Sequence, residues 1–413
     1  MPKPAHNHPY NLKRGVTKRS KKQPEPNVTF RERLGVDVVE PAEEADFTDG
    51  MVVPSCSHGK CLLFKLPKSN ERWFGCSLHR SEAECPFKCQ WPIGGPIAKS
   101  QKVPRAKLPS RVPIFEKIRK MPTFYFCLRC LDVFEDENAH FHGLRGPYKA
   151  DETDLLDLIM PEETDHFQAQ YWFTSEAIQI LFDSVLASGK THFLCVGTPQ
   201  VFNFLLSKPE YRDKVYLLDI DERFRAIYDD DHFSMFNMIN GEFWTNEAGF
   251  SKFLQTSDKL AVICDPPFAV FIKVLLKTLN NLVTEKPETD FVFTLPYFLD
   301  RHLFREMPNL KMIDYAITYQ NHPKYKSAKN SPVRFFTTLP PECFTLPGDL
   351  YKNCPDCNRY VAKTNQHCYD CKSCPSRDGS AVQHCLKCRR CVPLKYSHCN
   401  RCNTCSLKGR CHA

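Results

Sequence analysis

The sequence contains no long hydrophobic run. Among its 413 residues no stretch reaches the roughly 18 apolar residues that a helix needs to cross a bilayer, so we expect no membrane span. The amino-terminal residues are polar and basic and lack the apolar segment of a secretory signal peptide, so we expect no export. Integral membrane and secreted proteins are therefore disfavoured.

Cysteine, in contrast, is abundant, with 22 residues. In an exported chain such a number would indicate disulfides. Here many cysteines fall in Cys-x2-Cys pairs interleaved with histidine, and no export signal accompanies them. This combination predicts Zn2+ sites in a reducing compartment.

The net charge of +8 is unevenly spread. Residues 1–35 carry nine basic and two acidic side chains, residues 95–120 carry eight and one, and residues 351–413 carry twelve and three. The rest of the chain is acidic. Three basic segments on an acidic protein favour a polyanionic partner, of which nucleic acid is the commonest. A solubilising role for these segments is the plainer alternative.

Composition divides the chain into six segments. Residues 1–50 are rich in Lys, Pro and Glu and are expected to be disordered. The others are a Cys/His cluster at 51–94, a basic linker at 95–122, a second cluster at 123–150, alternating strand and helix signals at 151–345, and a Cys/His-rich tail at 351–413. The tail has too little apolar content for a core, so metal must replace one.

Residues 151–345 are typical of a doubly wound α/β domain. Thr174 or Ser175 is expected to cap a helix that runs to Gly189, and a second helix is expected at Phe268–Leu282. Strands are expected at His192–Val196, Val215–Leu218, Leu260–Cys264 and Asp290–Leu295, with an antiparallel pair near Met312–Thr318 and Val333–Thr338. This order matches class I methyltransferases, whose ligands bind beyond the carboxyl ends of the strands.

The strand at Leu260–Cys264 runs directly into Asp265-Pro266-Pro267-Phe268. The prolines stop the strand because neither can donate to a sheet ladder. Asp265 and the Pro266 carbonyl can accept the two N–H protons of an amino group on a flat ring, and Phe268 can stack on that ring. The tetrapeptide resembles the [Asp/Asn]-Pro-Pro-[Tyr/Phe] motif of amino-group methyltransferases that use S-adenosylmethionine. An ordinary strand-ending turn is the alternative.

Several residues are candidates for the cofactor pocket. Gly197 permits a tight turn and a close approach after the first strand, with Thr198 beside it. Asp219 ends the second strand, where a ribose diol would be held, and Asp221 is the alternative. Asn237 follows the third strand beside the expected adenine position, and Asp265 borders the same pocket. The segment with Gln170, Tyr171, Phe173 and Thr174 resembles a pocket segment of related adenine methyltransferases, although its aromatic residues would also cover a sheet edge.

Two N-terminal zinc fingers are expected. Cys56, His58, Cys76 and Cys85 resemble the ligands of the GRF zinc finger, which binds single-stranded nucleic acid; Cys61 and Cys89 remain as packed or free thiols. The second cluster, Cys127, Cys130, His140 and His142, resembles a compact C2H2 finger. Its histidines lie closer together than the usual spacing of three to five residues, so we expect four ligands here but leave open whether both histidines bind. Its expected role is to hold the finger region on the catalytic domain.

The tail repeats His-Cys-x2-Cys-x2-Cys three times. If each Cys pair borrows the His and the last Cys of the next repeat, three sites result: Cys354, Cys357, His367 and Cys374; Cys368, Cys371, His384 and Cys391; and Cys385, Cys388, His398 and Cys405. The interlacing resembles the zinc sites of Asp-His-His-Cys palmitoyltransferases, but that tetrad is absent. A fourth pair, Cys399 and Cys402, reaches His412 at the same offset, and Cys411 is the candidate for its remaining ligand.

The whole layout resembles the zinc-finger CCHC-type N6-adenosine methyltransferases of large-subunit ribosomal RNA. The resemblance implies S-adenosylmethionine as cofactor, five or more Zn2+ sites, ribosomal RNA as partner and a nuclear or nucleolar location, with the cytoplasm as an alternative; it indicates no protein partner. The zinc knuckle Cys-x2-Cys-x4-His-x4-Cys is absent from the sequence, which puts RNA affinity in question. The competing hypotheses are a DNA adenine or protein-glutamine methyltransferase and a non-catalytic RNA-binding scaffold.

Overall fold

The computed structural model describes residues 40–41, 53–65, 71–79, 84–91, 113–159 and 170–410. Most of the expected disordered segment 1–50, most of the basic linker, and Cys411 and His412 lie outside these ranges. In the described part of the chain no helix is long and apolar enough to cross a membrane.

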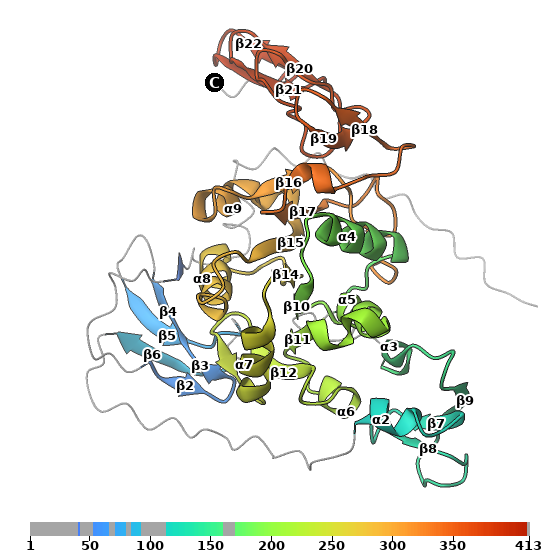
Figure 1. Ribbon diagram of the computed structural model, residues 1–413. Helices are drawn as coiled ribbons and strands as arrows, with labels where there is room; N and C mark the ends of the chain where they lie inside the picture. The colour runs from blue at the N-terminus through green and yellow to red at the C-terminus, as the bar shows by residue number, and fades with distance from the viewer. Residues whose placement is uncertain are drawn as a thin grey trace, which may run out of the picture.

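The centre of the molecule is an eight-stranded sheet in the order β13-β12-β11-β10-β14-β15-β17-β16 (Figure 1). The strands from β12 to β15 are parallel, and β13, β17 and β16 pair antiparallel. Their bounds are β10 His192–Val196, β11 Val215–Asp219, β12 Phe233–Asn237, β13 Glu242–Phe243, β14 Leu260–Cys264, β15 Asp290–Pro296, β16 Lys311–Ile313 and β17 Val333–Thr337. The predicted α/β class, the strands and the antiparallel pair are confirmed.

Helices cover both faces of the sheet, which is why its central strands are mostly apolar. In β10, Phe193 and Cys195 enter one core while Leu194 and Val196 enter the other. One face carries α4 Ser175–Ala187, α5 Pro199–Leu206 and α6 Phe224–Ile227; the opposite face carries α7 Glu247–Thr256, α8 Ile272–Leu282 and α9 Asp300–Glu306 (Figure 1).

Two helix predictions can be compared with these bounds. Thr174 is the N-cap of α4, and its side chain accepts a hydrogen bond from the Ala177 backbone N–H. The helix expected from Phe268 begins only at Ile272. The two prolines place a turn first, in which the Val270 N–H donates to the Pro267 carbonyl.

The first finger lies beside α7 and α8 (Figure 1). Its strands are β1 Glu40–Pro41, β2 Ser55–Cys56, β3 Gly59–Lys60, β4 Leu62–Lys65, β5 Arg72–Gly75 and β6 Lys88–Trp91. The Lys60 N–H donates to Glu242 at 2.7 Å, and the Asn240 amide donates to the Lys60 carbonyl at 2.9 Å. The finger is therefore bonded to the loop that links β12 and β13.

The second finger comprises α2 Ile114–Ile118, β7 Thr123–Cys127, β8 Asp132–Phe134 and β9 Arg145–Lys149, and α3 Leu155–Leu158 follows it. Phe124, Phe126 and Val133 are buried in the same core as α4 and α5. This segment thus packs directly on the central α/β domain.

The tail consists of three hairpins, β18 Tyr351–Cys354 with β19 Arg359–Ala362, β20 Val382–Cys385 with β21 Arg390–Pro393, and β22 Tyr396–Cys399 with β23 Thr404–Leu407. It projects from the β16 end of the sheet (Figure 1). Arg359 donates to Asp314 at 3.0 Å, and the Asn365 amide donates to the same carboxylate at 2.8 Å. These buried contacts fix the first hairpin to the sheet.

Candidate functional site

Asp265 lies at the carboxyl edge of the sheet, immediately after β14. Its backbone N–H donates to the Val196 carbonyl at 3.2 Å, which extends the pairing with β10 by one residue. On the neighbouring strand β15, the fully buried Thr294 donates its hydroxyl hydrogen bond to Asp265 Oδ1. No described donor contacts Oδ2, so one oxygen is held and the other remains available for a ligand.

The environment of Asp265 weakens its acidity. Burial raises the pKa of the carboxyl group to about 7, and the hydrogen bond from Thr294 acts in the opposite direction. Asp265 is half-buried, so a ligand that brings its own N–H donor can reach the unused acceptor.

The prolines and the aromatic residue complete this acceptor site. Among the described residues no donor reaches the Pro266 carbonyl, whereas the Pro267 carbonyl is used in the turn to Val270. Phe268 is half-buried and contacts both apolar cores. The structure thus brings together the two acceptors and the ring that the sequence predicted.

Gly197 forms the tight turn after β10, beside Asp265. Its φ of +64° is in the left-handed region, and a Cβ here would lie 2.9 Å from Met238 Cε and 3.1 Å from the Asp265 carbonyl oxygen. Only glycine allows the turn after β10 to approach the catalytic turn this closely. This turn fits the close approach of a cofactor, in a sheet whose ligands bind at this edge.

The acids at the end of β11 have different partners. Asp221 is bonded to Arg223, with Oδ2 to Nη2 at 2.6 Å, and to the Gln170 amide at 3.0 Å. Asp219 accepts the Asp221 backbone N–H at 2.9 Å, and no other described side chain donates to it. Burial, followed by the charge of Asp221, raises the pKa of Asp219 to about 7. Asp219 is therefore better placed than Asp221 to accept ribose hydroxyls.

The segment from Gln170 to Thr174 has several structural roles. The Gln170 side chain bridges Asp221 and Arg223. Phe173 is 3% exposed and pairs with Tyr319, and the Thr174 hydroxyl bonds that of Thr318 at 2.9 Å besides capping α4. Tyr171 remains 36% exposed at the rim. Gln170 therefore offers a polar side chain, and Tyr171 an exposed aromatic ring, near the predicted cofactor position.

Two of the predicted cofactor residues are almost completely buried. The Thr198 side chain is 2% exposed and donates to the Ile263 carbonyl at 3.4 Å. The Asn237 side chain is 1% exposed, donates to Ser77 of the first finger at 3.1 Å and accepts from the Ile239 N–H at 2.9 Å. Both side chains have partners within the protein, and their contact with the cofactor stays a prediction.

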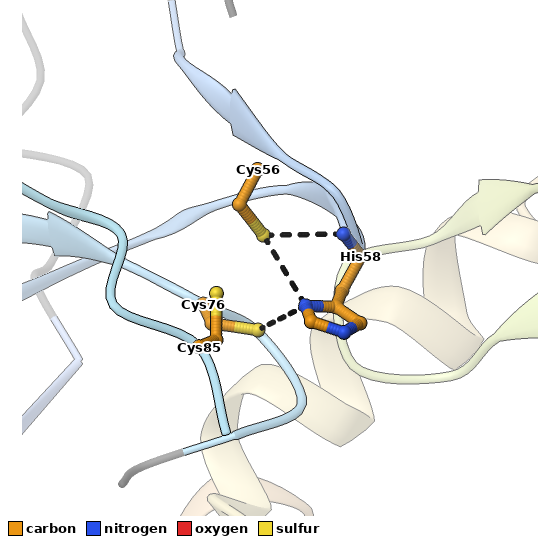
Figure 2. Close-up of side chains that lie close together, drawn as sticks. All are labelled: Cys56, His58, Cys76 and Cys85. Carbon is orange, nitrogen blue, oxygen red and sulfur yellow. Dashed lines mark hydrogen bonds between the residues drawn. The ribbon is translucent and has the colours of Figure 1, made fainter. Parts of the chain in front are cut away.

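The first finger brings its four predicted ligands together (Figure 2). The His58 ring nitrogen Nδ1 lies 3.6 Å from the Cys76 sulfur and 3.9 Å from the Cys56 sulfur. All ligand atoms in this group lie within 4.8 Å of one another. A thiolate at about 2.3 Å and an imidazole nitrogen at about 2.0 Å from a tetrahedral Zn2+ would be about 3.5 Å apart, so the geometry fits zinc. Cys61 and Cys89 lie outside the group, and Cys61 is packed in the finger core.

The second finger gathers Cys127, Cys130, His140 and His142. His140 presents Nε2 and His142 presents Nδ1, and each of these nitrogens lies 3.1 Å from the Cys130 sulfur. The use of different ring nitrogens compensates for the single residue between the histidines. Both predicted histidines therefore converge on the same site as the two cysteines.

The tail forms the three interlaced groups that the spacing predicted. Sulfur–sulfur distances are 3.8 Å for Cys357–Cys374, 3.7 Å for Cys371–Cys391 and 3.5 Å for Cys388–Cys405. These are edges of a zinc tetrahedron. The Cys388 backbone N–H, the largest cause, lowers the pKa of the Cys385 thiol to about 6, which favours the thiolate that metal requires.

Five of the Cys-x2-Cys pairs share one backbone turn: Cys127/Cys130, Cys354/Cys357, Cys368/Cys371, Cys385/Cys388 and Cys399/Cys402. The residue after the second cysteine has a φ between +46° and +51° in each: Leu131, Asn358, Lys372, Arg389 and Asn403. The pair Cys399 and Cys402 therefore has the turn of the metal sites, although Cys411 and His412 lie outside the described residues.

Sequence reasoning missed Thr294 and Tyr319. Thr294 lies in an apolar strand, and the bond to Asp265 arises only from the pairing of β14 with β15. Tyr319 follows β16 in a loop, and its hydroxyl is buried near the same acid. A threonine inside a hydrophobic strand was the one available signal.

Comparison with known proteins now places the chain. Residues 164–344 match the family model described as "Probable N6-adenine methyltransferase". The human rRNA N(6)-adenosine-methyltransferase ZCCHC4 is 31% identical over 390 residues, which cover 84% of this chain and 74% of that protein. The Xenopus tropicalis protein of the same name is 31% identical over 392 residues, covering 80% and 78%.

A more distant relative covers the central domain alone. The Saccharomyces cerevisiae protein-lysine N-methyltransferase EFM5 is 26% identical over 184 residues, 38% of this chain and 69% of the yeast protein. The match to the human and frog proteins extends far beyond that domain. The chain belongs to the ZCCHC4 family of rRNA N6-adenosine methyltransferases, enzymes that use S-adenosylmethionine.

Proposed function

We propose that this chain methylates N6 of an adenosine in large-subunit ribosomal RNA and that Asp265 and Pro266 hold the target amine. The observation that carries the proposal is the pair of acceptors without a described donor, Asp265 Oδ2 and the Pro266 carbonyl, beside the ring of Phe268. Family membership supports ribosomal RNA as the source of the adenine.

The residues act by positioning. The target adenosine leaves its stack at a cost of a few kcal/mol, which is least for an unpaired base. Phe268 stacks on the base, while Asp265 and the Pro266 carbonyl accept its two N6 protons and turn the nitrogen lone pair outward. S-adenosylmethionine supplies an electrophilic methyl group. Holding the amine in line with that methyl accounts for most of the acceleration, and the product then loses one N6 proton.

The remaining roles follow from the same frame. Asp219 is proposed to hold the cofactor ribose and Gly197 to admit the cofactor beside the catalytic turn. The two fingers and the tail are proposed to hold structural Zn2+ and to contribute to RNA binding. Action on ribosomal RNA supports a nuclear or nucleolar location, with the cytoplasm as the alternative.

The test uses labelled S-adenosylmethionine with three substrates: total RNA, genomic DNA and a protein extract. We expect label in ribosomal RNA as N6-methyladenosine. Asp265→Ala should abolish the label while RNA binding and the unfolding temperature stay near wild type. Asp183→Ala removes an exposed carboxylate on α4 and should behave as wild type. Label in protein or DNA alone, or full activity of Asp265→Ala, would refute the proposal.

A further inference from the structure

The Tyr319 hydroxyl is a buried donor with no assigned role. The side chain is 1% exposed, and its hydroxyl makes no hydrogen bond of normal geometry to a described residue, although the Thr294 hydroxyl lies near enough to lower its pKa. Buried hydroxyls are nearly always hydrogen-bonded, so each exception needs an explanation. Other buried tyrosines follow the rule: Tyr216 bonds Ser234 at 2.7 Å, and Tyr351 accepts the Ala316 N–H at 2.9 Å.

The sheet places Tyr319 at the catalytic edge. The Ile317 N–H donates to the Val333 carbonyl at 3.1 Å, and Val333 pairs with Pro296 at the end of β15. Thr294, which bonds Asp265, lies two residues earlier on that strand. The chain from Ile317 to Tyr319 therefore crosses the edge at which β14 and β15 end.

The aromatic ring is held in place from several directions. Its centroid lies 5.2 Å from that of Phe173 at an interplanar angle of 31°, and the two residues form a β-bridge. Tyr171 packs edge-on at 6.2 Å, and the Tyr319 N–H donates to the Tyr325 carbonyl at 3.0 Å. The hydroxyl is thus a fixed group, not one that turns to find solvent.

The neighbouring charge keeps this hydroxyl protonated. Burial, and after it the Asp265 carboxylate, raise the pKa of Tyr319 well above its usual range. No acceptor among the described residues makes a hydrogen bond of normal geometry with the protonated Tyr319 hydroxyl, so this O–H remains a donor for a ligand.

We propose that Tyr319 is a base-recognition residue whose O–H donates to N1 of the target adenine, a role that rests on the proposed function. N1 adjoins the carbon that bears the N6 amine, and flipped bases are commonly read on this Watson–Crick edge. In adenine N1 is an acceptor, whereas guanine carries an N1–H there. Tyr319 would therefore add a hydrogen bond to adenine, while guanine is rejected because its O6 acceptor would face the two acceptors of Asp265 and Pro266.

The test compares wild type and Tyr319→Phe on three RNAs that differ only at the target base: adenosine, 1-deazaadenosine and 7-deazaadenosine. Tyr319→Phe should lower kcat/KM about tenfold to a hundredfold on adenosine and 7-deazaadenosine, because each loses a hydrogen bond to N1. On 1-deazaadenosine, which has no N1, the variant should stay within about twofold of wild type.

Tyr216→Phe is the matched control. It removes a buried hydroxyl that bonds Ser234 away from the site, so it should lower the unfolding temperature without any dependence on the base. Equal losses by Tyr319→Phe on all three RNAs, or a loss spared only on 7-deazaadenosine, would overturn the N1 assignment. A wild type that labels none of the RNAs would overturn the proposed function and this role with it.

Discussion

The central sheet and the tail are stabilised in different ways. Strands β10, β11 and β14 are buried on both sides by helices, and almost every side chain in them is apolar. The tail hairpins contribute few buried residues, chiefly Val361 and Val392 together with cysteines. One region is thus held by a continuous apolar core and the other by ligand bonds to metal. Loss of metal should therefore unfold the tail and leave the central sheet folded.

The largest effect should follow removal of zinc. Structural zinc contributes roughly 10–16 kcal/mol per site in small fingers, so chelation should unfold the tail while the sheet persists. Far-ultraviolet circular dichroism and limited proteolysis should then show a protected central domain and a digested tail. Cys371→Ser should release the tail in the same way, whereas Cys343→Ser, outside every cluster, should not. A tail that resists proteolysis without zinc would contradict the comparison.

A smaller effect should follow loss of the anchor between the two regions. Arg359→Ala leaves the 4% exposed carboxylate of Asp314 without its cationic partner, at a cost of about 3–5 kcal/mol. We expect the tail to detach with its zinc still bound, as measured by zinc content and by cleavage before Tyr351. Lys352→Ala, whose amine bonds Gln366 at the surface, is the matched control. Zinc loss together with detachment would show that the anchor and the metal act as one unit.

The smallest effect should be a shift in pH dependence within the sheet. Asp265 must be ionised to accept from N6, so activity should fall as pH drops through its pKa of about 7. Thr294→Val removes a hydrogen bond that favours the Asp265 carboxylate. The pKa of Asp265 should therefore rise further, and the acidic limb of the pH–activity profile should move to higher pH by about one pH unit. Thr294→Ser should restore the wild-type profile. An unshifted limb in Thr294→Val would mean that another group controls the rate.

In both regions, the features predicted from the sequence are those that depend on residues close together in the chain. Apolar runs located β10, β11, β14 and β15, and Cys/His spacing sorted the tail ligands into their three groups. The links between distant segments were not predictable: the Thr294–Asp265 bond needs the strand order, and the Arg359–Asp314 pair needs the docking of the tail. Asn237 is a further example of such a link. The sequence suggested a cofactor contact for its side chain, but in the structure its amide donates to Ser77 of the first finger, 160 residues away.

The borrowing of ligands between neighbouring repeats constrains how the tail can change in length. Each Cys pair relies on whichever histidine and cysteine come next, so removing residues 367–383 would leave Cys354 and Cys357 facing His384 and Cys391, a complete set in the same order. Removing part of a repeat would instead leave a pair without its complement. The tail can therefore gain or lose whole repeats without leaving a metal site incomplete. Its length can vary among descendants of one ancestor in steps of one repeat.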